Sequence, residues 1–208
     1  MRFCGVVPFA VAQDGAACLL LAREAYGRDK QLWSAFAGRV DATEADVDPE
    51  TIAAREAHEE SMGMLGSAAD LASALRVHAV RMDVAAGVHF LLALPFDGDL
   101  PQRFANLRAR ALAAAPSPDH YSPFLEKDQV AWVRVDRVRR SGLRYRRGFW
   151  LDLDRVCKGV VEHAARVVVP LVSPPRPPPL PPLPPGPDPF ATPPTSTSLE
   201  ARLSVQRG

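Results

Sequence analysis

Proline divides the chain into two parts of different physical character. Of the 21 prolines in this sequence of 208 residues, 14 fall between Pro170 and Pro194. Proline has a fixed φ and no backbone N–H, so a segment this rich in proline favours polyproline II and coil over a packed core. We therefore predict one folded domain over residues 1–169 and a disordered Pro-rich tail over residues 170–208.

Charge and apolar content narrow the class of protein. A formal net charge of +1 gives no overall field that would draw the chain to nucleic acid or to an anionic membrane. The longest uncharged apolar stretch, Val84 to Phe96, has 13 residues, and a membrane-spanning helix needs roughly 20. The three cysteines are widely spaced among apolar residues, as is typical of reduced thiols. We expect a cytoplasmic protein without membrane spans.

Hydrophobic patterning predicts strands interleaved with a few helices. The expected strands cover residues 3–12, 17–22, 32–37, 75–82, 87–96 and 129–135, and the expected helices cover 49–62, 67–74, 102–115 and 149–168. Asp48 followed by Pro49 is a strong helix start, because the aspartate accepts free amide hydrogens and proline has none to lose. This alternation predicts an α/β or α+β sandwich.

Three glutamates crowd one side of the helix that begins at Pro49. At about 100° per residue, Glu56, Glu59 and Glu60 fall within an arc of about 100°. Like charges at this spacing repel each other by a few tenths of a kcal/mol per pair. A hard cation such as Mg²⁺ or Mn²⁺ would relieve the repulsion, and so would solvent together with Arg55. These residues alone leave both interpretations open.

The segment around this helix resembles the signature of the Nudix hydrolase family. The matching residues are Gly38, Glu44, Arg55, Glu56, Glu59, Glu60 and Gly63. The preceding Trp33 and Phe36 are similar to a flank found in some eukaryotic and viral members. The resemblance covers residues 3 to about 165. It implies an α/β/α sandwich around a mixed sheet, and hydrolysis of a nucleoside diphosphate linked to another moiety, with Mg²⁺ or Mn²⁺ as cofactor.

The resemblance also implies roles for individual residues. It makes Glu56, Glu59 and Glu60 metal ligands, one of which takes a proton, with Arg55 orienting them. It adds the backbone carbonyl of Ala37 as a ligand. It also assigns Gly38 and Glu44 to cofactor binding, as residues that support the loop around the metal. A further base or ligand is expected from a loop before the last strand, where this chain has Glu126. The alternative for Glu126 is a surface pairing with Lys127 or solvent.

This chain departs from the family pattern at three places. The loop between Glu44 and Arg55 is three residues longer than in the family, so Asp46 or Asp48 could take the place of Glu44. Ala37 stands where the family has glycine, and alanine fits there only if its φ is negative. One extra residue, Met62, precedes Gly63, so the helix is expected to run slightly longer.

Substrate and partners are less defined by the sequence. The markers of particular Nudix subfamilies are missing, so the resemblance specifies only a nucleotide derivative. Five arginines between Arg139 and Arg147 could hold phosphates or RNA, or could lie in a solvated turn. The segment from Arg176 to Pro182 matches a basic residue followed by PxxP, the pattern that binds SH3-type domains, and a solvated linker is the alternative. A non-catalytic nucleotide-binding module with an adaptor tail is therefore the second candidate, although it would not need three crowded glutamates.

Overall fold

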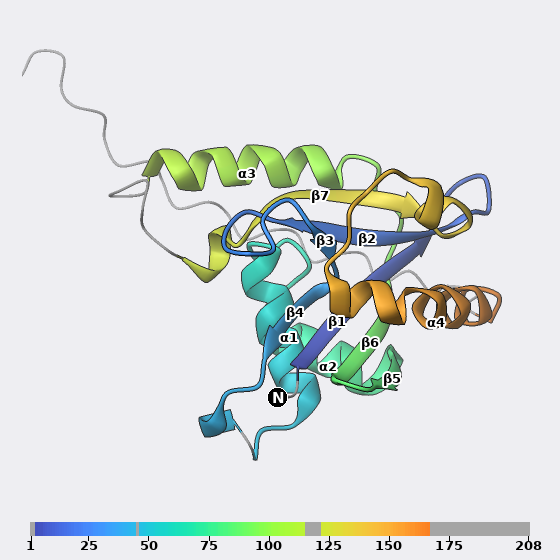
Figure 1. Ribbon diagram of the computed structural model, residues 1–208, viewed down its shortest axis with the longest axis horizontal. Helices are drawn as coiled ribbons and strands as arrows, with labels where there is room; N and C mark the ends of the chain where they lie inside the picture. Colours follow the sequence, from blue (N-terminus) through green and yellow to red (C-terminus); the bar gives the residue numbers. More distant parts are fainter. Residues whose placement is uncertain (1–2, 45, 115–121, 167–208) are drawn as a thin grey trace, which may run out of the picture. The chain divides into compact units, whose positions relative to one another are not determined.

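A computed structural model describes residues 3–44, 46–114 and 122–166. The Pro-rich tail, its expected boundary at 169 and the segment from Arg176 to Pro182 lie outside the described residues. Within them the chain forms a seven-stranded mixed sheet with helices on both faces (Figure 1). This arrangement confirms the expected α/β/α sandwich.

Strands and helices are interspersed along the chain. The strands are β1 (Phe3–Val11), β2 (Ala17–Glu24), β3 (Trp33–Ser34), β4 (Phe36–Arg39), β5 (Val80–Val84), β6 (Gly87–Ala93) and β7 (Lys127–Arg134). The α-helices are α1 (Pro49–Glu60), α2 (Ala68–His78), α3 (Leu100–Ala114) and α4 (Arg147–Ala164). Short 3-10 turns cover Ala42–Glu44, Pro123–Leu125 and Val135–Arg140. No described helix has both the length and the apolar composition needed to cross a membrane.

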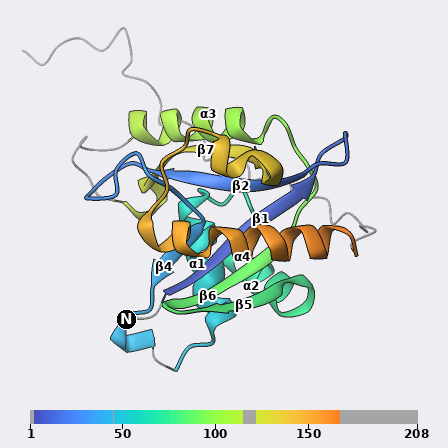
Figure 2. The ribbon, with the colours of Figure 1, turned by 45° about the vertical axis from the view of Figure 1, so that its right-hand side comes forward.

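Strand β1 is the point where the sheet divides into two arms. One edge of β1 pairs in parallel with β6, which pairs with β5. On its other edge, the first half of β1 pairs with β4 and the second half with β2. The end of β2 diverges from β1 and pairs with β3, and β7 pairs with nearly the whole length of β2 (Figure 2). We call β1, β4, β5 and β6 the first arm, and β2, β3 and β7 the second arm.

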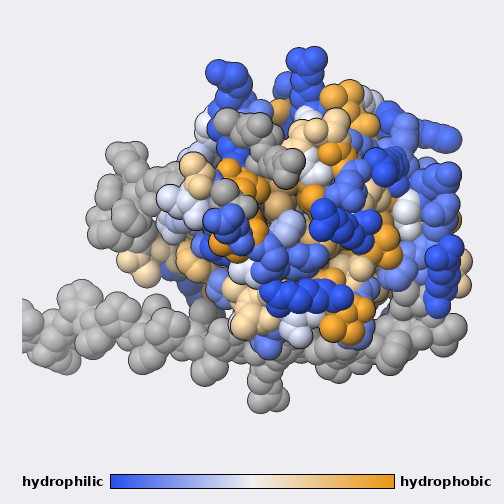
Figure 3. Space-filling view, turned by 90° about the horizontal axis from the view of Figure 1, so that it is seen from below, coloured by the Kyte–Doolittle hydropathy of each residue, from blue (hydrophilic) through white to orange (hydrophobic). Residues whose placement is uncertain are grey.

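Each face of the sheet has its own hydrophobic core. Helices α1, α2 and the start of α3 cover one face, where Phe36, Ile52 and Phe90 are among the buried side chains. Helix α4 covers the other face, and its Leu153 packs there with Phe9 of β1. Full burial of such a side chain contributes about 1.5–3 kcal/mol. On the side of the molecule shown in Figure 3, hydrophilic and hydrophobic residues are interspersed.

Three sequence-based boundaries need correction. The strand expected from residue 75 is wrong over residues 75–78, because α2 continues to His78 and buries Leu75 beside Leu71 at helical spacing. The strand expected over 32–37 is broken into β3 and β4. Helix α1 ends at Glu60, earlier than expected, because Met62 and Gly63 take positive φ values of 57° and 75°.

His89 of β6 is a buried imidazole that packs beside Phe3 and Phe149. Its ring lies 4.9 Å from that of Phe3 and 6.0 Å from that of Phe149, and its ring nitrogens have no hydrogen-bond partner among the described residues. The nearest carboxylate oxygen, on Asp152, is 4.0 Å from Nε2. Burial lowers the pKa of His89 to about 4.

We predict a loss of stability on acidification that His89 accounts for. Below pH of about 6.5 the unfolded chain binds a proton that folded His89 does not, so stability falls as the pH drops towards 4. Between pH 7.5 and 5 the loss due to His89 is about 2 kcal/mol. Urea unfolding at both pH values should show a smaller decrease in the free energy of unfolding for His89→Phe than for the parent chain. Equal decreases in both chains would contradict the assignment.

Removal of the tail should leave the folded domain intact. The last residue of the core on the α4 face is Val160, so a chain that ends at Val169 retains every buried side chain described here. We expect its melting temperature to match that of the full chain to within about 2 °C. A drop of many degrees would show that a residue after 169 contributes to the core.

Candidate active site

Local sequence explains how α1 is positioned. The Asp48 side chain accepts a hydrogen bond of 3.0 Å from the Thr51 amide, and Pro49 occupies the first turn. Buried Ile52, Ala53 and Ala57 hold the helix on the sheet. The neighbouring face, which carries Glu56 and Glu60, is thereby turned towards β4.

Two glutamates of α1 lie directly against the backbone of strand β4. The amide of Ala37 donates a hydrogen bond of 2.9 Å to Oε2 of Glu60. A Cβ atom at Gly38 would lie 1.9 Å from Cδ of Glu56, so the carboxyl group of Glu56 lies in space that only glycine leaves free. Ala37 is not among the residues with positive φ, and the condition for alanine at this position is met.

Gly38→Ala should destabilise the protein by about 1–3 kcal/mol, because the added methyl group must displace Glu56 or the strand. A suitable control is Gly148→Ala on α4, where a Cβ would meet no atom within 4 Å. Urea unfolding of both variants tests the difference. Equal stabilities would show that Glu56 is not held against Gly38.

Arg55 links the carboxylates on the outer side of α1. Its guanidinium lies 3.0 Å from Oε1 of Glu44, 2.7 Å from Oε1 of Glu56 and 3.2 Å from Oε2 of Glu59. Asp48 instead caps α1 and pairs with Arg76. The carboxylate of Glu44 therefore contacts Arg55 even though the loop between them is longer than in the family.

A buried charge network continues behind Glu60. The side chain of Lys127 is fully buried, and its Nζ lies 2.8 Å from Oε1 of Glu60 and 2.5 Å from Oε1 of Glu24. The same oxygen of Glu24 accepts a hydrogen bond of 3.0 Å from Ser34 and one of 3.1 Å from Arg146. This network joins β2, β7, α1 and the start of α4. Sequence reasoning missed Glu24. It considered Arg146 only as one of five arginines that could hold phosphates or lie in a solvated turn, and Lys127 only as a surface partner of Glu126.

Glu126 lies in the turn before β7 and hydrogen-bonds to Glu60 through its side chain. Two carboxyl groups this close share a proton or need a nearby cation. Burial raises the pKa of Glu126, of Glu56 and of Glu60, the last to about 8, although Arg55 and Lys127 act in the opposite direction. A cation bound beside these groups would offset the cost of burying their charged forms.

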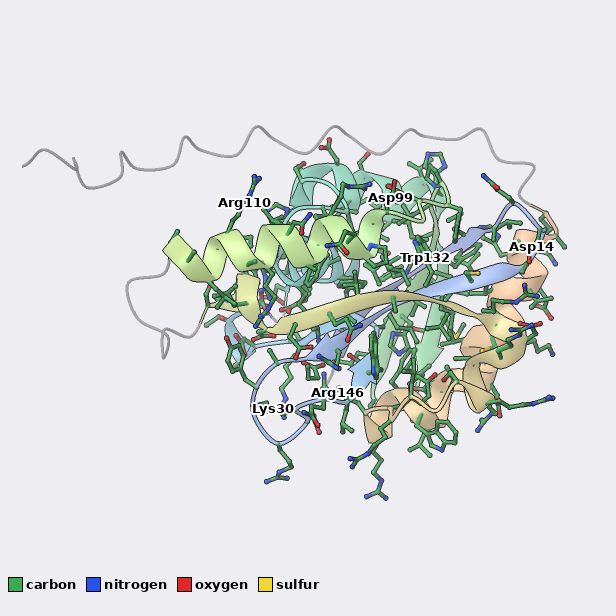
Figure 4. All side chains as sticks on the ribbon, turned by 90° about the horizontal axis from the view of Figure 1, so that it is seen from above. Asp14, Lys30, Asp99, Arg110, Trp132 and Arg146 are labelled. Atoms are coloured by element: carbon green, nitrogen blue, oxygen red, sulfur yellow. The ribbon has the colours of Figure 1, made fainter. Side chains whose placement is uncertain are left out.

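These carboxyl groups open onto a pocket of about 970 Å³. Its lining includes Gly38, Glu56, Glu60, Glu126, Arg28, Arg39, Arg146, Arg147, Phe3 and Phe149. Arg146 lies beside the loop that carries Lys30 (Figure 4), and its Nε is 3.0 Å from Oδ2 of Asp29. Arg139, by contrast, pairs with Asp154 and lies over Trp150. The pocket thus offers acidic, basic and aromatic groups to one ligand.

The donor set suits a hard divalent cation. As the side chains lie, no three His, Cys, Asp or Glu side chains of the described residues converge on a common ion position. Carboxylate oxygens are nevertheless the ligands that Mg²⁺ and Mn²⁺ prefer. The carboxyl groups are Glu24, Glu44, Glu56, Glu59, Glu60 and Glu126, and the cations paired with them are Arg55, Lys127 and Arg146. Within this set of paired groups, six carboxyl groups share three cations, and Arg28, Arg39 and Arg147 of the pocket lining are further cations nearby.

Comparison with known proteins gives structural matches only. No family-level sequence model and no curated protein matches the chain. One similar solved structure is the Nudix hydrolase RenU from M. smegmatis, with 19% identity, a TM-score of 0.42 and coverage of 81% of this chain and 88% of that one. Another is the NUDIX domain of Shewanella oneidensis NrtR complexed with ADP ribose, with 12% identity, a TM-score of 0.44 and coverage of 78% and 87%. A mutT/nudix family protein from Listeria innocua has 15% identity, a TM-score of 0.43 and coverage of 79% and 94%.

Proposed function

We propose that the protein hydrolyses a diphosphate linkage in a nucleoside diphosphate joined to another moiety, as a Nudix-type hydrolase dependent on Mg²⁺ or Mn²⁺. The observation that carries this proposal is the gathering of acidic side chains from α1 and the turn before β7 at a pocket that also holds arginines. A bound divalent cation would supply charge that polarises a phosphate oxygen and lowers the pKa of a water molecule.

The chain's own residues take the following parts. Glu56, Glu59 and Glu60, with the carbonyl of Ala37, would hold the cation. Arg55 keeps Glu56 and Glu59 in place and Glu44 fixes Arg55 from the loop, while Gly38 lets Glu56 approach the strand. Glu126 is the candidate base, because its raised pKa brings it closer to neutral pH than a solvated glutamate.

The pocket also provides binding groups for the substrate. Arg28 and Arg147 are exposed cations in its lining, placed to pair with phosphate oxygens. Phe3 and Phe149 add apolar surface for the linked moiety or for the nucleobase of the substrate. These groups favour a nucleotide derivative as the ligand class.

Hydrolysis is tested directly on the purified chain. A panel of nucleoside diphosphate derivatives is incubated with Mg²⁺ or Mn²⁺, and release of mononucleotide is measured by chromatography. We expect cleavage of at least one member and its loss on addition of a chelator. Absence of cleavage across the panel with either metal would overturn the catalytic proposal.

The second candidate is a non-catalytic nucleotide-binding module. It is favoured by one observation: Lys127 and the Ala37 amide engage both oxygens of Glu60, which leaves that carboxylate less free to bind a metal. Titration calorimetry on the same panel separates the two, because this candidate predicts binding without turnover. Its adaptor role, with an SH3-type partner at Arg176 to Pro182, and the cytoplasmic location remain predictions.

A further inference from the structure

Lys127 is a buried cation for which the proposed reaction has no use. Its side chain is fully buried, and its ammonium lies between Glu24 at the end of β2 and Glu60 at the end of α1. Removing an ammonium group from water is costly unless several acceptors surround it. Here two carboxylates do so, at 2.5 Å and 2.8 Å.

The Lys127 ammonium is surrounded by oriented carboxylate oxygens, which are also the ligands that a hard metal cation prefers. Glu24 Oε1 also accepts hydrogen bonds from Ser34 and Arg146, and the second oxygen of Glu60 accepts one from the Ala37 amide. Both carboxylates are therefore held rigidly by groups other than Lys127. If the ammonium were removed, the two carboxylates would keep their orientation, and no cation would remain between them to balance their negative charge.

We propose that Lys127 is a built-in cation, which occupies a position between Glu24 and Glu60 that a divalent metal would otherwise take. In this role it is a positioning residue, which holds Glu60 beside Glu126 without contacting the ligand. Exchangeable cations are then confined to the other glutamates of the pocket lining, Glu56 and Glu126. Only this last consequence rests on the proposed function.

Mn²⁺ binding tests the role of Lys127 without any measurement of activity. Free Mn²⁺ is followed by its electron paramagnetic resonance signal during titration of the full chain and of Lys127→Ala. We expect the variant to bind one Mn²⁺ per chain more than the parent. Mn²⁺ should also raise the melting temperature of the variant by several degrees more than that of the parent.

Two further variants control the measurement. Lys30→Ala removes an exposed lysine from the loop 25–32 and should leave the Mn²⁺ stoichiometry unchanged. Lys127→Ala combined with Glu24→Gln removes one of the two carboxylates and should abolish the additional site. An additional site that persists in the double variant would place it elsewhere and overturn the proposal.

Every other outcome also decides the question. Equal Mn²⁺ stoichiometry in the parent and in folded Lys127→Ala overturns the proposal. If Lys127→Ala does not fold alone, refolding on addition of Mn²⁺ supports the proposal, and failure to refold in both this variant and Lys127→Gln overturns it. If the parent binds no Mn²⁺ and the variant binds one, the built-in cation stands and the metal dependence of the proposed function fails.

Discussion

Replacing Glu59 with glutamine should lower turnover at least about 100-fold, which corresponds to about 2.7 kcal/mol of lost transition-state stabilisation. The amide removes a negative charge from the group that would hold the divalent cation. Glu56→Gln should have a similar effect, and in the absence of metal it should not reduce stability, because the pKa of Glu56 is raised and its charge is unfavourable there.

The comparison is made by steady-state kinetics with saturating Mn²⁺. Glu162→Gln is a matched control, because Glu162 is exposed on α4 and lies 3.9 Å from Lys158, away from the pocket. It should retain the parent rate. Parent-like rates for both Glu59→Gln and Glu56→Gln would show that the site is assigned to the wrong residues.

Lys127→Met should lower the free energy of unfolding by about 3–5 kcal/mol in a metal-free buffer near neutral pH. The substitution keeps the length of the side chain but leaves Glu24 and Glu60 buried without their shared ammonium. Urea unfolding measures the loss. Adding Glu60→Gln to Lys127→Met should recover part of it, because a buried amide needs no cationic partner.

A loss below about 1 kcal/mol for Lys127→Met would contradict this prediction. It would mean that the network around Glu24 is neutral in the folded protein. The same result would remove the physical reason for a cation at this position.

The sequence predicted those parts of the site that depend on neighbouring residues. Asp48 and Pro49 set the start of α1 through contacts within one turn, and the helical repeat then placed Glu56 and Glu60 on one side. Arg55 reaches Glu59 from four residues away in the same helix. Such features follow from spacing alone.

The remainder depends on contacts between segments distant in the sequence. Lys127 and Glu24 are 103 residues apart, and Arg146 and Glu24 are 122 apart, so no local pattern indicates that they meet. A lysine beside a glutamate in a loop is typical of a solvated surface, which is why Lys127 was expected there. Only the pairing of β2 with β7 turns its side chain inward.

Because the sheet divides at β1, the acidic site is completed only when both arms are in place. Glu24 and Lys127 belong to the second arm, whereas Ala37 and Gly38 belong to the first. Contacts of such large sequence separation form late in folding, so partly folded chains lack the site. A ligand that binds only the complete site stabilises the whole native state, by about 2.7 kcal/mol at 100 times its Kd. The lifetime of the protein against proteolysis should therefore rise and fall with the concentration of its ligand.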